Sequence, residues 1–359
     1  MIHRRRALLT GSAALVSFNA LAQPVAPGGR AGYHKLNPGS LTGSAPPLPA
    51  FDLNLMTSTL DPSITYTRNS IATDGLYTDA PGSAYNTFAV NVPRISSARG
   101  FLLEDARNNW LLNSDAPATQ SISGAGVATY CLWVIGTGTA TSSAGTAIGS
   151  GFGVAIAGVP NVFSVTTSGS ITITVSGQLN RFQLESGVGV PTSYISTTGV
   201  TASRQAEVGT LPLGAWYNNA EGTVVVDFVK IVSAGGSFND LPCLYQDNTN
   251  MIGARIPGAL NIQSVIWAAN VNTSATAQVG PINLGSVNKF VVSYSRITNS
   301  IWACLNGGAV LGNVVSAFPA TPTQIRFGIT RSSALNGWAR RFRYWQSVLS
   351  PANLQAVTR

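Results

Sequence analysis

Alternation of apolar and polar residues is the main pattern in the middle of the chain. In GSITITVSG (169–177), the isoleucines and the valine fall on one side of an extended segment, and the threonines between them fall on the other. Similar short runs, separated by Gly, Ser and Asn, are ATYCLWVIG (128–136), GFGVAIAG (151–158), NVFSVTT (161–167) and NRFQLES (180–186). The pattern predicts a small antiparallel β-sandwich over residues 113–205.

A second series of apolar strands begins with GTVVVDFVKIV (222–232) and continues almost to the last residue. Its other members are MIGARI (251–256), LNIQSVIWAANV (260–271), KFVVSYSR (289–296), SIWACLNGG (300–308), QIRFGIT (324–330) and WARRFRYW (338–345). They predict a second sandwich over residues 206–359. A short helix should close the chain, because Ser350 suits the N-cap and Pro351 suits the first helical position.

The last predicted strand, WARRFRYW, combines aromatic rings with arginines. Strand parity predicts that one face is the core face and that Arg341 and Arg343 point outward from the other. The core-face set is Trp338, Arg340, Phe342 and Tyr344. An exposed platform of rings and cations for nucleic acid or a glycan is the alternative, which this parity disfavours.

The N-terminal part is predicted to lack a packed core of its own. Residues 1–22 read as an export signal of twin-arginine character, with the small-residue site Ala20-Leu21-Ala22; an uncleaved basic arm is the alternative. Residues 23–62 are predicted to be an extended linker or anchor because they are rich in Pro, Gly and Ser. Residues 63–112 are predicted to be a connecting region of short strands, with a short helix or turn after Gly100.

Composition narrows the function classes. Charged residues make up 9% of the chain, against about 25% in a typical globular protein, which suits extracellular or virion β-proteins. The net charge is +8, three units of which come from Arg4, Arg5 and Arg6, so no nucleic-acid partner is expected. No membrane-spanning helix is expected after residue 22. Three cysteines, Cys131, Cys243 and Cys304, are predicted to be buried thiols.

Catalytic chemistry is disfavoured by what the sequence lacks. Its two histidines, His3 and His34, fall outside the predicted sandwiches, so they supply no catalytic triad or zinc site there. Glycoside hydrolysis needs two carboxylates, and strand-borne candidates in the second sandwich reduce to Glu221, Asp227, Asp240 and Asp247. The sequence therefore predicts a non-enzymatic protein.

One segment raises the question of a metal. LYQDNTNMIG (244–253) places Asp247, Asn248 and Asn250 close together, and their oxygens suit a calcium ion. An Asx-rich turn between two strands is the alternative, and the composition favours it. No cofactor is predicted, apart from this possible calcium ion.

Several short motifs, taken in order, resemble a family of tailed-phage and prophage structural proteins, the tail or head fibres. RGFLLEDARNNWLLNS (99–114) is similar to the family's "G-LLIE-x-x-R-T-N-LL-x-x-S" segment, and residues 63–96 are similar to its "T-R-x-S-x-A-T" stretch. FQLESGVGVPTSYISTTGVTASRQAE (182–207) resembles "Q-LE-x-G-x-x-x-TSYI-P-T", and GTVVVDF (222–228) follows. LNGWARRFRYWQSVLSPANLQAVT (335–358) resembles the ending of a concanavalin A-like, or laminin G-like, domain.

This chain departs from the family pattern at three places. Asn109-Trp110 replaces Asn-Leu, Ser196 replaces the proline of TSYIP, and Glu207 stands where Asp is common. None of these changes removes a catalytic group, because the family segments are structural.

The resemblance implies an all-β virion protein in which a carbohydrate-binding-module-like sandwich precedes a concanavalin A-like one, after an extended arm. It implies attachment to host-surface polysaccharide, contact with other virion proteins through the arm, and a homotrimer. A secreted or periplasmic glycan-binding or glycan-active protein and a purely structural virion protein are the alternatives. Sugars stack on rings and bond to amides, so the predicted ligand contacts are Tyr245, Asn248, Trp267, Trp302 and Asn306. Core packing is the alternative for each ring.

Overall fold

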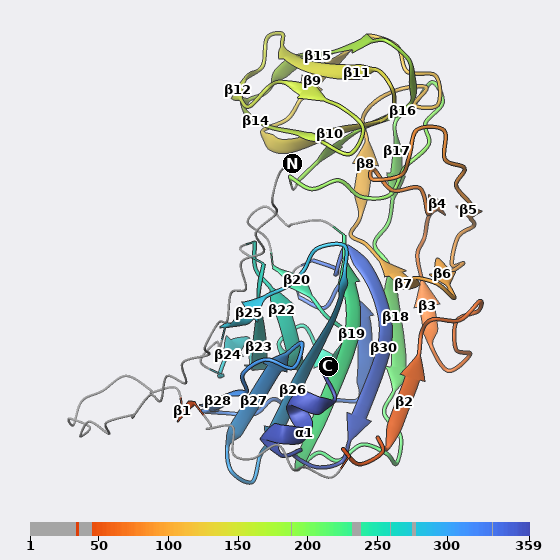
Figure 1. Ribbon diagram of the computed structural model, residues 1–359. Helices are drawn as coiled ribbons and strands as arrows, with labels where there is room; N and C mark the ends of the chain where they lie inside the picture. Colours follow the sequence, from red (N-terminus) through yellow and green to blue (C-terminus); the bar gives the residue numbers. More distant parts are fainter. Residues whose placement is uncertain are drawn as a thin grey trace, which may run out of the picture. The chain divides into compact units, whose positions relative to one another are not determined.

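A computed structural model describes residues 34–35, 45–187, 189–231, 238–258, 260–274, 278–331 and 333–359 (Figure 1). Over these ranges the protein is almost entirely β, and the all-β prediction is confirmed. The described part contains one helix, α1 (Pro351–Ala356); the Ser350 hydroxyl caps it by accepting a hydrogen bond from Asn353 N, as predicted. None of the described helices is long and apolar enough to cross a membrane. The predicted signal or arm over residues 1–22 lies outside the described residues.

The first sandwich consists of two four-stranded antiparallel sheets. Their strand orders are β12–β14–β10–β16 and β13–β11–β15–β9. Strand bounds are β9 (Gln120–Ala125), β10 (Ala128–Gly136), β11 (Thr139–Ala144), β12 (Ile148–Ser150), β13 (Val154–Ala155), β14 (Asn161–Thr167), β15 (Gly169–Ser176) and β16 (Leu179–Ser186). Its core contains Ile171, Ile173 and Phe163, so the period-two pattern that predicts β15 also identifies the buried side.

The surface of the first sandwich is almost free of charge. Residues 116–180 contain no Asp, Glu, Lys, Arg or His. Hydroxyls, amides and backbone groups take their place, together with exposed aliphatic side chains such as Ile148 and Val159.

The second sandwich is larger. One sheet has the order β1–β28–β27–β26–β19–β30–β7–β6, with β2 also paired to β30; the other has the order β24–β23–β22–β21–β29–β18–β3, with β20 on β22 and β25 on β23. The first sheet comprises β1 (His34–Lys35), β2 (Phe51–Asn54), β6 (Ile95–Ser96), β7 (Gly100–Leu103), β19 (Glu221–Lys230), β26 (Val287–Ser295), β27 (Ser300–Leu305), β28 (Leu311–Val314) and β30 (Gly337–Trp345). The second comprises β3 (Thr65–Thr67), β18 (Val208–Pro212), β20 (Asn239–Asp240), β21 (Cys243–Asp247), β22 (Asn250–Ile256), β23 (Asn261–Ala268), β24 (Val271–Asn272), β25 (Gln278–Pro281) and β29 (Gln324–Gly328).

The region before the first sandwich contributes strands to the second. β2, β3, β6 and β7 all lie in sheets of the second sandwich, although the sequence places residues 51–112 in a linker and a connecting region. The helix or turn predicted after Gly100 is wrong: Gly100–Leu103 is a strand whose four residues are all buried. A short apolar run of this kind suits a buried strand as well as a helix turn, so the pattern alone does not separate the two.

Four further strands form two small pairs. β4 (Ala72–Thr73) pairs with β5 (Thr87–Phe88), and β8 (Arg107–Asn109) pairs with β17 (Ala202–Arg204). Segment 74–86 therefore forms the loop that joins β4 to β5, and its position matters for the site described below.

A β-bulge in β30 changes the predicted parity. Asp227 pairs with Arg341 and Phe228 pairs with Ala339, so Arg340 is the extra residue. Phe342 and Tyr344 lie in the core between the sheets, as predicted. Trp338 pairs with Val229 on the outer face of the sheet, and Arg340 also lines cavities on that face, so the predicted place of these two residues on the core face is wrong. Arg341 and Arg343 lie outside that core, where they pair with Asp52 and Asp227.

Candidate functional site

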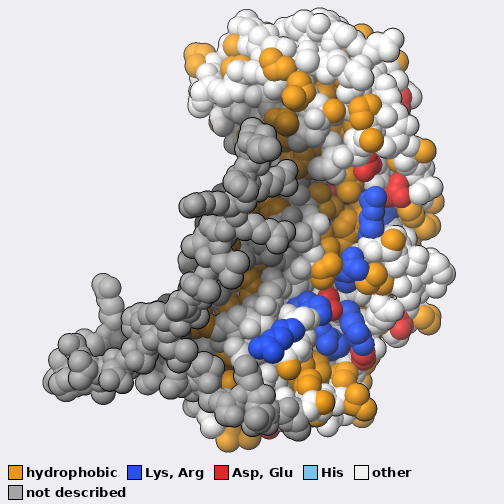
Figure 2. All heavy atoms as spheres, viewed as in Figure 1, with side chains coloured by type: hydrophobic (Ala, Val, Ile, Leu, Met, Phe, Trp, Pro, Cys, Tyr) orange, Lys and Arg blue, Asp and Glu red, His pale blue; other side chains and the backbone are white. Residues whose placement is uncertain are grey.

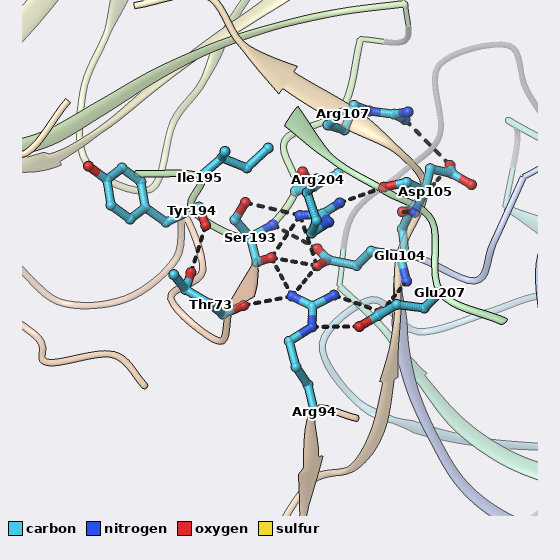
Figure 3. Close-up of polar contacts among 12 residues, drawn as sticks. Thr73, Arg94, Glu104, Asp105, Arg107, Ser193, Tyr194, Ile195, Arg204 and Glu207 are labelled. Atoms are coloured by element: carbon cyan, nitrogen blue, oxygen red, sulfur yellow. Dashed lines mark hydrogen bonds and ion pairs between the residues drawn. The ribbon is translucent and has the colours of Figure 1, made fainter. Parts of the chain in front are cut away.

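The polar residues of the fibre-like motifs meet in a buried cluster of ion pairs (Figure 3). Arg94 makes two contacts of 2.7 Å with the carboxylate of Glu207, and its Nη1 lies 2.7 Å from Glu104 Oε2. Arg68 contacts Glu207 at 3.1 Å, and Arg204 contacts Glu104 at 3.2 Å. Every one of these side chains is at most 2% exposed.

The TSYI segment supplies further hydrogen bonds to this cluster. Ser193 donates from its backbone nitrogen and from its hydroxyl to the two oxygens of Glu104, at 2.7 and 2.6 Å. Burial alone would raise the pKa of Glu104, but Arg204, Arg94 and the Ser193 hydrogen bonds outweigh it and lower that pKa to about 2. The cluster joins the residue after β7, Ser193 and the residue before β18, and because its charged side chains are buried, its role is to hold these segments together.

An open cleft lies on the outer face of the sheet that contains β19, β30 and β7. It consists of a cavity of about 490 Å³ and an adjoining one of about 350 Å³, which share Asp79, Arg99 and Trp338 in their walls. Its polar side chains also include Asp74 and Arg340, and we call it the Trp338 cleft. Three structural features assemble it: the bulge in β30, the turn between β6 and β7, and the β4–β5 loop.

The two arginines of the Trp338 cleft are not neutralised. The Arg99 guanidinium lies 5.7 Å from the centre of the Trp338 ring, and Arg340 Nη1 donates weakly to Ala98 O at 3.4 Å. Among the described residues, neither arginine forms an ion pair with a carboxylate. By contrast, the next two arginines of β30 are both paired with carboxylates, so Arg99 and Arg340 are cations of this cleft that an anionic ligand would find available.

The acidic residues of the cleft hold its loop in shape. Asp74 accepts hydrogen bonds from Asn86 N at 2.6 Å and from Asn86 Nδ2 at 2.8 Å. Asp79 Oδ2 accepts from Leu76 N at 2.8 Å. Their carboxylates therefore fix the β4–β5 loop and also add hydrogen-bond acceptors to the wall of the cleft.

Three of the predicted ligand residues gather on the outer face of the other sheet. Tyr245 and Trp267 pack with Cys243 and Met251, and the Tyr245 hydroxyl donates to Asn248 Oδ1 at 2.5 Å. The Arg331 guanidinium lies 3.8 Å from the centre of the Trp267 ring, so it occupies the place where a sugar would stack. These residues stay a predicted ligand site.

The other two predicted ligand residues lie elsewhere. Trp302, on β27, packs against the cluster of Val225, Leu354 and Val357 beside α1. Asn306 occupies a turn with φ of 48°, and its side chain accepts a hydrogen bond from Lys289 N at 2.7 Å. The structure therefore does not bring the five predicted residues into one site.

The predicted calcium ligands Asp247, Asn248 and Asn250 form the turn between β21 and β22. Asp247 Oδ1 accepts from the Thr249 hydroxyl at 2.6 Å and from Thr249 N at 2.7 Å, and these bonds lower the pKa of Asp247. Asn250 Nδ2 also donates to Asp247. In the described ranges, no three residues of the types His, Cys, Asp or Glu stand close enough together to hold a metal. These contacts are those of an Asx-rich turn, and calcium binding stays a prediction.

The four strand-borne carboxylates considered for catalysis are also dispersed. Asp227 pairs with Arg343 on the outer face of one sheet. Asp240, on the other sheet, accepts a hydrogen bond from the Thr330 hydroxyl at 2.6 Å. Glu221 lies at the start of β19, and Asp247 lies in the turn just described.

Fold and site together define an all-β protein of two sandwiches, with an aromatic and arginine-lined cleft on the outer face of the second. No protein-family model matches the chain, and no curated protein matches it.

Some solved structures are similar over part of the chain. The CBM40 of Ruminococcus gnavus IT-sialidase bound to alpha2,3 sialyllactose has 15% identity and a TM-score of 0.33, over 40% of this chain and 84% of that one. NanB sialidase from Streptococcus pneumoniae has 13% identity and a TM-score of 0.33, over 41% and 26%. The binding domain of Botulinum Neurotoxin DC in complex with SialylT has 10% identity and a TM-score of 0.33, over 42% and 39%. Likeness at this level says nothing about what this chain binds.

Proposed function

We propose that this protein is a non-enzymatic attachment protein that binds a glycan in the Trp338 cleft. The observation that carries the proposal is the pair of unneutralised arginines, Arg99 and Arg340, beside Trp338 in a cavity of about 490 Å³. Ligand pockets of about 300–1,000 Å³ commonly combine an apolar wall with a few convergent polar groups. Here the edge of the indole, which is 5% exposed, forms the apolar wall together with Leu76, Val229 and Ile231, and guanidinium and carboxylate groups surround it.

We propose further that the protein acts on a phage or prophage virion, as a fibre or surface decoration. The order of the fibre-like motifs supports this, since their charged residues build the buried cluster around Glu104 and Glu207. An N-terminal arm would hold the protein to other virion proteins, and a homotrimer would present three clefts. Several copies acting together would compensate for weak binding of one sugar.

A glycan array probed with the full chain tests the attachment function. We expect binding by the wild type and a loss of at least about tenfold in affinity for Trp338→Leu, because the variant lacks the aromatic wall. Trp267→Leu is the matched control, since it changes a tryptophan of the predicted site on the other sheet. Loss of binding in Trp267→Leu alone would overturn the cleft as the site, and no binding by the wild type would favour a purely structural protein.

The glycan-active alternative has one specific observation in its favour. Asp74 and Asp79 both line the Trp338 cleft, and glycoside hydrolysis requires two carboxylates. Each of them is engaged in hydrogen bonds that hold the loop. We expect no new reducing ends when the protein is incubated with the oligosaccharides it binds, and their appearance would contradict the non-enzymatic proposal.

The proposed location has a direct test in the mature protein. A virion protein anchored by its basic arm should keep Met1 or Ile2, whereas a secreted or periplasmic protein exported through a twin-arginine signal should begin at Gln23. N-terminal sequencing of the protein from its natural source distinguishes the two.

A further inference from the structure

A second pocket adjoins the Trp338 cleft. It has a volume of about 340 Å³ and is lined by Asn54, Met56, Asp227, Val287, Lys289, Arg340 and Arg341. Arg340 stands in the walls of both the cleft and this pocket. Because the bulge residue belongs to both, the two cavities are neighbours along the outer face of β30.

Positive charge continues from the cleft into this pocket. Figure 2 shows Lys and Arg side chains gathered on the face that β19 and β30 present, with only a few acidic ones among them. Arg341 pairs with Asp52, its Nε lying 2.7 Å from Asp52 Oδ1, and Lys289 Nζ donates to the Arg359 carbonyl. Arg340 itself has no carboxylate partner among the described residues, although it stands between the two cavities.

We infer that the glycan bound here is a carboxylated oligosaccharide. It occupies both the Trp338 cleft and the adjoining pocket lined by Lys289, with its carboxylates at Arg99 and Arg340. This inference rests on the proposed glycan-binding function and names its ligand class. A guanidinium binds a carboxylate through two parallel hydrogen bonds, which a neutral sugar has no group to accept in that form. The carboxylates of Asp74 and Asp79 are suited to accept hydrogen bonds from sugar hydroxyls, so the cleft matches both kinds of group on an acidic sugar.

Isothermal titration calorimetry of the full chain separates ligand class from ligand length. We expect tetragalacturonate to bind at least about tenfold more tightly than monogalacturonate, and at least about tenfold more tightly than the neutral maltotetraose. Affinity for tetragalacturonate should fall as salt rises, because the attraction between exposed charges is screened. 3′-Sialyllactose, with a single terminal carboxylate, should bind more weakly than tetragalacturonate.

Three variants locate the contacts. Arg99→Gln should reduce the preference for tetragalacturonate over maltotetraose. Arg340→Gln should in addition reduce the advantage of the tetramer over the monomer, because it changes the residue common to both cavities. Lys289→Gln should weaken the tetramer and leave the monomer unchanged. Arg326→Gln, on the other sheet beside Tyr245, is the control and should change nothing; circular dichroism checks that each variant is folded.

The outcomes separate this inference from the function on which it rests. Equal affinity for tetragalacturonate and maltotetraose overturns the inference and leaves glycan binding standing. Tighter binding of 3′-sialyllactose than of tetragalacturonate, or no dependence on chain length, overturns occupation of both cavities. If no saccharide binds to a folded wild type, the proposed function fails as well.

Discussion

Trp338 owes its position to one additional residue in a strand. The bulge at Arg340 turns the indole to the outer face, while Phe342 and Tyr344, beyond the bulge, keep their core positions. Strand parity predicts the positions of Phe342 and Tyr344 correctly, because the alternation of inward and outward residues is uninterrupted from Phe342 to the end of β30. It fails for Trp338 because a one-residue register shift exchanges the two faces and leaves no mark in the hydrophobic pattern.

Glu104 should make the stability of the protein depend on acidity. Its pKa is about 2 in the folded protein against a usual value of 4.5, so its stabilising contribution is complete above pH 4.5 and is lost as the pH falls through 2. At pH 7, Glu104→Gln should lower the free energy of unfolding by about 3–5 kcal/mol, because Arg94 and Arg204 lose a buried partner.

Urea unfolding of both proteins from pH 7 to pH 2.5 measures this effect. The difference between wild type and variant should shrink below pH 4.5. A difference that stays constant over this range would show that the carboxylate charge is not what stabilises the cluster.

Lys230 should also make stability rise with pH, but in the neutral to alkaline range. Its Nζ donates to Asn239 Oδ1 at 2.8 Å and to Leu335 O at 2.9 Å, and burial lowers its pKa from 10.5 to about 7. Between pH 7 and 10.5 the unfolded chain therefore holds a proton that the folded protein lacks, and stability rises with pH. The unfolding free energy of the wild type, minus that of Lys230→Met, should increase between pH 7 and pH 10. A flat difference would contradict the lowered pKa.

Strand β7 is the element on which both the core and the cleft depend. Gly100 begins it with φ of 109°, and a Cβ there would lie 2.4 Å from the Ala339 carbonyl oxygen. No sequence pattern predicts this close approach of Gly100 to the backbone of β30. The sequence shows only a glycine beside an apolar run, which suits a helix start, a turn or a strand.

Gly100→Ala should therefore destabilise the protein more than a comparable change elsewhere. Gly124→Ala is the matched control, because Gly124 also has a positive φ, of 82°, but nothing lies within 4 Å of its would-be Cβ. Backbone strain of this kind costs about 1–3 kcal/mol, and the clash should add to that cost in Gly100→Ala. Thermal unfolding measures both variants. An equal loss of stability in the two variants would show that β7 shifts away from β30 to accommodate the new Cβ with no loss of free energy.

At the scale of the molecule, the chain builds its second sandwich from two separate stretches. Leu53 and Phe101, from before the first sandwich, lie in the same core as Phe228 and Phe342. The sequence predicts two sandwiches because each has its own run of alternating strands. It does not predict this sharing, because β30, which pairs with both β2 and β7, is more than two hundred residues away along the chain.

Because the core is shared, we expect a fragment that contains only the C-terminal stretch of the second sandwich to fold poorly. A chain of residues 206–359 lacks β2, β3, β6 and β7, so β30 loses its neighbours β2 and β7 and the core loses Leu53 and Phe101. This fragment should fail to unfold cooperatively, whereas residues 45–359 should unfold in a cooperative thermal transition. Circular dichroism against temperature tests both, and a cooperative transition in the shorter fragment would contradict the dependence.

The uncharged stretch of the first sandwich has a consequence for how the protein responds to acid. Residues 116–180 contain no side chain that becomes protonated as the pH falls, whereas the cluster around Glu104 loses its ion pairs when its carboxylates are protonated. Strands β9 to β15 therefore contain no group that acid can protonate, and Glu185 on β16 is the buried carboxylate of the first sandwich. Acid should loosen the protein first at the cluster around Glu104, while β9 to β15 keep their fold.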